Sequence, residues 1–185
     1  DWQVDTFHRY IASFEDGHRI KVDVNDGFES EAEREEVVEI YGFLLGQMPA
    51  VLRRGVKQMV LYPEGDSWNA STGEVNIHHG NYAIELADGS LEESMIHETV
   101  HTSIDDRHAE SRGWKQAQRA DGVFISDYAA ETPEGEDLAE TFTLYLALAL
   151  DPGRFSDEDY DIITSTIPNR IAYLERHFPV SKLGL

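Results

Sequence analysis

The residues best suited to chemistry in this chain are the five from His97 to His101, which read His-Glu-Thr-Val-His. On a helix, two histidines four positions apart lie on one face, so both imidazoles can reach one zinc ion at about 2.0–2.1 Å. Zinc lowers the pKa of a bound water to about 7, and Glu98, next to His97, could take the proton of that water. The spacing therefore predicts a site for metal-assisted hydrolysis.

The alternative is a chance match on a solvated helix, because the chain is rich in histidine and in acidic residues. The context favours a metal site. Asp88-Gly89-Ser90 precedes the motif, and Ser90 with Glu93 has the form of a capping box. We expect the helix that begins there to run to about Asp105. Apolar residues surround the motif at Leu91, Met95, Ile96, Val100 and Ile104.

A catalytic zinc site normally has three protein ligands and one water, so a third ligand must follow the motif. The nearest candidates are Asp105, Asp106, His108 and Glu110. The metzincin pattern requires glycine at position 104 and histidine at position 107. Ile104 and Arg107 stand there, so we reject that class.

A better candidate lies on a predicted helix from Thr132 to Leu150, which begins with a capping residue, a proline and an acid. Glu136 and Glu140 share one face of it. The opposite face is apolar and contains Leu138, Phe142, Tyr145 and Leu146. One carboxylate would bind the zinc, and the other would accept a hydrogen bond from a ligand histidine and fix its tautomer. We interpret Glu134 and Asp137 as ordinary solvated acids.

A His-Glu-x-x-His helix followed by a helix with two glutamates four apart resembles the gluzincin metallopeptidases. The closer similarity is to the lethal-factor-like branch and its small secreted relatives. Those proteins carry Tyr-Ala and then a Glu-x-x-Ala-Glu-x-Phe helix, which Tyr128-Ala129 and the segment from Glu136 to Phe142 match. The resemblance covers roughly Gly73 to Leu150.

By this resemblance Glu136 is the third ligand of a single zinc ion, and Glu140 is the carboxylate that accepts a hydrogen bond from a ligand histidine. Tyr128 would donate a hydrogen bond to the oxyanion of the tetrahedral intermediate. A short insertion, Glu131 to Gly135, separates Tyr128 from Glu136. The alternative for Tyr128 is therefore a half-buried residue at a helix end.

Strands come first and helices later, which indicates an α+β fold. The expected elements are a hairpin of Phe7–Phe14 and Arg19–Val24, a helix over Glu29–Gly46, strands at Lys57–Tyr62 and Gly73–His79, and helices over Ser111–Ala120, from Ser156 and from Pro168. The short connection Asp66–Thr72 suggests that the strands on either side of it pair antiparallel.

The resemblance implies one zincin-like catalytic domain over residues 1–185. Residues 1–89 would form mainly strands plus one helix, and residues 90–185 would be mainly helical. A small mixed sheet would lie over the metal helix, with an edge strand above the metal.

In such folds the edge strand binds an extended peptide by β-augmentation. Gly73–His79 fits that place, so Asn76, His78 and His79 could contact substrate. The two histidines could instead be plain surface residues.

Composition limits the classes of partner. The 185 residues include no cysteine, which excludes disulfides and thiolate metal sites. The formal charge of −21 repels phosphate backbones, so we expect no nucleic-acid partner. The longest apolar run, Leu144–Leu150, is far too short for a membrane span. The chain begins at Asp1 rather than Met, and we expect an exported protein, secreted or periplasmic.

The sequence therefore predicts a zinc-dependent peptidase, an endopeptidase that cleaves short or unfolded segments. One alternative is a catalytically inactive binding module with a zincin fold and a structural zinc. Structural zinc sites are usually closed and rich in cysteine, and Glu98 would have no role there. Another alternative is a metal hydrolase with a non-peptide substrate, since its chemistry would be the same. The sequence specifies neither the oligomeric state nor the native divalent ion.

Overall fold

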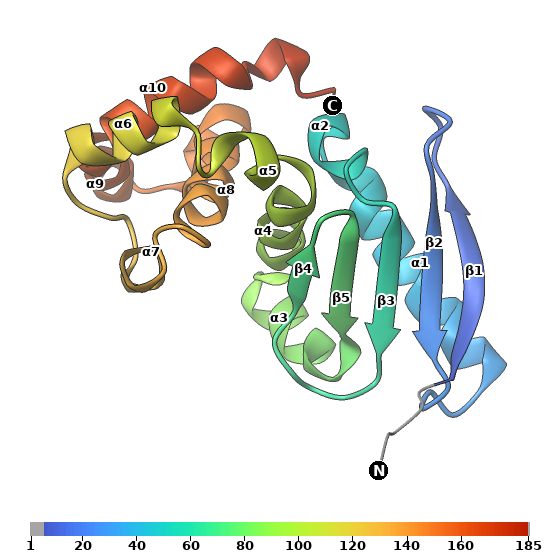
Figure 1. Cartoon of the computed structure of the whole chain (residues 1–185). Helices are drawn as coiled ribbons and strands as arrows, with labels where there is room; N and C mark the ends of the chain where they lie inside the picture. The colour runs from blue at the N-terminus through green and yellow to red at the C-terminus, as the bar shows by residue number, and fades with distance from the viewer. Residues whose placement is uncertain (1–5, 185) are drawn as a thin grey trace. The chain divides into compact units, whose positions relative to one another are not determined.

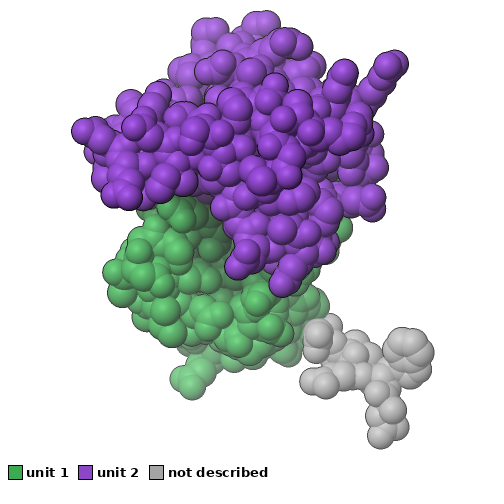
Figure 2. Space-filling model, turned by 90° about the vertical axis from the view of Figure 1, so that its left-hand side faces the viewer, with its two compact units in different colours: residues 1–103, 185 green, residues 104–184 purple. Residues whose placement is uncertain are grey.

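The computed structural model of the chain describes residues 6–184, in two compact units. The first unit ends at Ser103, and the second runs from Ile104 to Gly184 (Figure 2). The first contains a small mixed sheet with helices packed on it, and the second is helical (Figure 1). The α+β class expected from the order of elements is therefore confirmed. A single catalytic domain with a zincin-like fold stays a prediction.

Five strands form the sheet within the described residues. They are β1 (Phe7–Ser13), β2 (Arg19–Asn25), β3 (Gln58–Tyr62), β4 (Asn69–Ser71) and β5 (Glu74–His78). Their order across the sheet is β1-β2-β3-β5-β4. β1 pairs antiparallel with β2, which confirms the predicted hairpin, and β4 pairs antiparallel with β5. The central pairs β2–β3 and β3–β5 are parallel.

Two predictions about β5 are wrong. β5 runs parallel to β3, because the connection between them contains β4, and β4 takes the antiparallel position beside β5. Gly73 follows β4 with a φ of +84°, a conformation that glycine adopts at little cost, and the chain reverses there. β5 therefore has a neighbour on each side. The edge strand on this side of the sheet is β4 and not the segment Gly73–His79.

The helices of the first unit pack on one face of the sheet (Figure 1). They are α1 (Glu31–Gln47), α2 (Ala50–Arg53), α3 (Tyr82–Asp88) and α4 (Leu91–Ser103), with a 3₁₀ turn, η1 (His79–Asn81), before α3. The side chain of Ser30 caps α1 by accepting a hydrogen bond from the backbone N–H of Glu33. The core joins Val22, Val24, Met59, Leu61, Val75 and Ile77 of the sheet to Tyr41 and Leu45 of α1 and to Leu91 and Met95 of α4. Burial of this apolar surface fixes α4, which carries the histidine motif, against the sheet.

The second unit is built around α8 and α10. Its helices are α5 (Asp105–His108), α6 (Arg112–Asp121), α7 (Asp127–Glu131), α8 (Asp137–Leu150), α9 (Asp157–Thr166) and α10 (Pro168–His177), with 3₁₀ turns η2 (Pro152–Arg154) and η3 (Val180–Lys182). Trp114 of α6 lies edge-on to Tyr173 of α10, with ring centroids 5.4 Å apart, and Phe142 of α8 packs on Phe178 at 5.3 Å. Within residues 6–184 no helix is both long and apolar enough to cross a bilayer.

The predicted helix from Thr132 to Leu150 begins later than expected. Its first five residues form a turn, in which the backbone N–H groups of Gly135 and Glu136 both donate to the carbonyl of Thr132. α8 then starts at Asp137, with Glu136 in the capping position. Glu136 thus lies at the junction of a turn and a helix, and not inside a helix.

Candidate metal centre

The two motif histidines lie on α4 as their spacing predicts. The ring centroids of His97 and His101 are 4.9 Å apart, and both side chains are partly exposed. Met95 and Val100 of the same helix are fully buried, and they hold its other side in the core. Glu98 keeps only 8% of its surface exposed. A helix that is buried on one side thus presents two imidazoles together on the other.

The two buried threonines of α4 form hydrogen bonds with the backbone of their own helix. Thr99 donates to the carbonyl of Met95 at 2.7 Å, and Thr102 donates to the carbonyl of Thr99 at 2.9 Å. Each hydroxyl therefore bonds within the helix, so two threonines can be buried without leaving an unpaired donor. Ser103, at the end of α4, instead donates to the carbonyl of Leu52 in α2 and ties the two helices together.

Close packing beside Ser103 leads to a first prediction. A Cβ added at Gly55 would lie 2.0 Å from Ser103 Oγ and 2.5 Å from Ser103 Cα. The Cα belongs to the backbone of α4 and cannot rotate away, so G55A must shift the helix that carries His101. We expect this change to lower the free energy of unfolding of the metal-free protein by about 1–3 kcal/mol, as overpacking typically does. Urea unfolding in the presence of a chelator measures it.

The matched control is G42A. An added Cβ at Gly42, in α1, would meet no heavy atom within 4 Å among the described residues. Alanine also favours a helix over glycine, by about 0.5–1 kcal/mol. Equal unfolding midpoints for G42A and G55A would show that the contact between Gly55 and Ser103 does not constrain α4.

The third predicted ligand completes a group with the two histidines. One ligand atom from each of His97, His101 and Glu136 lies within 4.8 Å of the other two. Bonds of about 2.0–2.1 Å in a tetrahedron place ligand atoms about 3.3–3.5 Å apart, a spacing that lies below this limit of 4.8 Å. Two imidazoles and one carboxylate are also a donor set that catalytic zinc sites use. The group could therefore hold a metal ion.

The two remaining residues predicted from the resemblance lie in the second unit. Glu140 follows Glu136 by one turn of α8, where its backbone N–H donates to the Glu136 carbonyl at 2.9 Å, and its side chain is partly buried. Tyr128 lies in the short helix α7 with 52% of its surface exposed. The assignment of Tyr128 to the oxyanion and of Glu140 to a ligand histidine stays a prediction.

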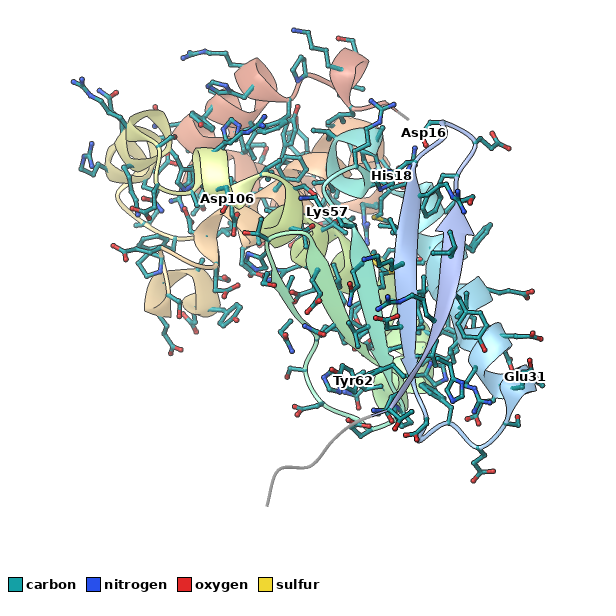
Figure 3. The ribbon with its side chains drawn as sticks, turned by 45° about the vertical axis from the view of Figure 1, so that its right-hand side comes forward. Asp16, His18, Glu31, Lys57, Tyr62 and Asp106 are labelled. Carbon is teal, nitrogen blue, oxygen red and sulfur yellow. The ribbon has the colours of Figure 1, made fainter. Side chains whose placement is uncertain are left out.

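Two of the residues predicted to contact substrate lie on the sheet face that turns away from α4. Successive side chains of a strand point to opposite faces, and Val75 and Ile77 of β5 are buried in the core with α4. Asn76 and His78 therefore point to the other face, where Tyr62 also lies (Figure 3). Asn76 donates to the side chain of Asn69 at 3.1 Å, and His78 stacks on Tyr62 with ring centroids 5.0 Å apart. This orientation weighs against contact with a ligand bound at α4.

His79 belongs to the edge of the core. Its Nδ1 is 3.0 Å from the hydroxyl of Tyr41, and its ring stacks on Tyr82 with centroids 5.1 Å apart. Burial lowers the pKa of His79, and burial also raises the pKa of the Tyr41 phenol. These contacts favour a packing role for His79, with a neutral ring.

The prediction for Asp137 is wrong. Asp137 is not a solvated acid, because its side chain is fully buried and ion-paired with Arg170, which is also fully buried. Gln118 donates a second hydrogen bond to the same carboxylate at 2.8 Å. Burial raises the pKa of the Asp137 carboxyl, and the bonds from Gln118 and Arg170 act in the opposite direction. Asp137 directly follows Glu136, so this unpredicted network adjoins a residue of the metal-binding group.

Comparison with known proteins identifies no relative. No family model matches the chain, and neither a curated protein nor a solved structure matches it. The resemblance to the gluzincins therefore stays a prediction that rests on the motif residues.

Proposed function

We propose that this chain is a zinc-dependent endopeptidase of the gluzincin type. The observation that carries the proposal is the approach of the ligand atoms of His97, His101 and Glu136 to within 4.8 Å of one another. Glu98 is the second support, since it follows the first histidine and is nearly buried. A structural metal site would give Glu98 no role, whereas a hydrolase needs a base at that place.

The proposed mechanism assigns one task to each residue. Zinc held by the three ligands would supply Lewis acidity and a water of lowered pKa. Glu98 accepts the proton of the attacking water and passes it to the leaving amine. Glu140 orients a ligand histidine through a hydrogen bond, and Tyr128 donates to the developing oxyanion.

Substrate binding is best assigned to the edge strand β4. β4 lies at the end of the sheet, and β5 already has a partner on each side. An extended peptide can pair only with a strand that has an unpaired edge. The two edge strands of the described sheet are β1 and β4, and β4 is the one that packs against α4, the helix of His97 and His101. β4 spans only Asn69–Ser71, which limits the pairing to a short stretch of substrate. So short an edge strand is consistent with a zincin-like peptidase that accepts a restricted set of peptides.

The proposal is tested by metal analysis of the purified protein together with cleavage of a library of unstructured peptides. We expect one zinc per chain and cleavage of internal peptide bonds that a zinc chelator abolishes and added zinc restores. Bound zinc without peptide cleavage would instead favour a hydrolase with a non-peptide substrate. A protein that binds no zinc would leave only the inactive binding module.

A further inference from the structure

Arg170, at the third position of α10, is buried inside the second unit without any exposed surface. Its guanidinium donates to the carboxylates of Asp121 and Asp137 and to the carbonyl of Val123. Asp121 also accepts from the backbone N–H groups of Asn169 and Arg170, at 2.8 and 3.1 Å. One buried cation thus joins two buried carboxylates from α6 and α8.

Charges are costly to bury, and apolar packing can often replace a buried ion pair without loss of stability. Apolar packing is already present here, because Trp114, Leu174 and Phe142 are fully buried in the same unit. An ion-paired network adds a fixed orientation to such packing, since each hydrogen bond restricts the angle between the groups that it joins. The role of this network therefore depends on which group it orients.

The network holds the chain on both sides of Glu136. On one side, Asp137 is fixed by Arg170 and by Gln118 Nε2 at 2.8 Å. On the other side, Gln118 Nε2 also donates to the carbonyl of Pro133 at 3.2 Å. Glu136 itself donates through its backbone N–H to the carbonyl of Thr132 at 2.8 Å. These hydrogen bonds thus hold the backbone segment from Thr132 to Asp137, which includes Glu136.

We propose that Arg170, Asp137 and Gln118 are positioning residues, which hold the backbone of Glu136 so that its carboxylate can bind the metal together with His97 and His101. This inference rests on the proposed function. None of the three residues needs to touch the metal or the substrate. They act through Glu136, as hydrogen-bonded partners behind metal ligands do in known metal sites.

The decisive variant is Q118M, which keeps the length of the side chain and removes both of its hydrogen bonds. The matched control is N169A, which removes a 2.8 Å side-chain hydrogen bond on the far side of Asp121. Three measurements compare the variants: zinc affinity in competition with a chelator, the visible spectrum of the Co²⁺-substituted protein, and urea unfolding of the metal-free protein. The Co²⁺ spectrum reports ligand geometry, which a loss of stability alone does not change.

We expect zinc affinity to fall about tenfold or more in Q118M, with a changed Co²⁺ spectrum. N169A should match the wild type in both, and urea unfolding of the metal-free proteins shows how much stability each variant has lost. Equal zinc affinity and equal spectra for Q118M and the wild type would overturn the inference. So would an equal loss of affinity in N169A, because the effect would then follow from general destabilisation.

R170K is a second, stronger variant. Lysine keeps the positive charge but cannot reach Asp121, Asp137 and Val123 at once, so we expect a larger loss of zinc affinity than in Q118M. A soluble, folded R170K with wild-type affinity would contradict the proposal, and if R170K does not fold, Q118M decides. A wild-type protein that binds no zinc would overturn the proposed function and this inference together. Zinc binding that is insensitive to Q118M would overturn the inference alone.

Discussion

The variant E98Q is expected to keep its zinc and to hydrolyse peptides roughly 10²–10⁴-fold more slowly than the wild type. Glutamine has nearly the shape of glutamate, so it fits a position that exposes only 8% of its surface. Its amide cannot take a proton from water. The ligands His97, His101 and Glu136 are unchanged, so metal binding should persist. Zinc content and kcat/KM for a peptide found in the library screen measure the two effects.

The control for E98Q is E92Q, the same chemical change at an exposed position of the same helix. We expect E92Q to match the wild type in zinc content and in rate. An E98Q protein as active as the wild type would show that another group is the base. Loss of zinc in E98Q would instead show that Glu98 helps to hold the metal.

The histidine pair could be predicted because its geometry is local. Four residues of helix bring His97 and His101 onto one face, whatever the rest of the chain does. The start of that helix is also local, since Asp88-Gly89-Ser90 directly precedes α4. In the structure the two rings are neighbours, as this spacing predicts, with centroids 4.9 Å apart.

The order of the strands could not be predicted in the same way. β4 has only three residues, too few for an alternating pattern, and the sequence around it resembles a loop. Without β4, the short connection between β3 and β5 suggests a hairpin. The observed pairing depends on contacts between segments distant in the sequence, which no local pattern of residues records.

The predictions for the residues next to Glu136 were wrong for a related reason. Thr132-Pro133-Glu134 has the form of a helix start, yet α8 begins only at Asp137. The partner that buries Asp137 is Arg170, which lies 33 residues further along the chain. A carboxylate paired over that distance cannot be distinguished from a solvated one in the sequence.

The second large effect concerns the third ligand. We expect E136A to lower zinc affinity by roughly 100-fold or more, because only two ligands remain. Mutation of a residue that hydrogen-bonds to a metal ligand typically lowers metal affinity by about 10–100-fold. E140A should keep one zinc per chain, with affinity reduced within that smaller range. Competition with a chelator of known zinc affinity measures both, and urea unfolding of the metal-free proteins separates metal binding from folding.

The matched control is E134A, which removes an exposed acid two residues before Glu136 and should leave zinc affinity unchanged. This control matters because the chain carries a net charge of −21, and any lost carboxylate weakens the attraction for a cation slightly. Only a loss well beyond that of E134A identifies a ligand. If E140A lost its zinc and E136A kept it, the two glutamates would have exchanged roles. The ligand atoms of His97, His101 and Glu136, all within 4.8 Å of one another, favour Glu136.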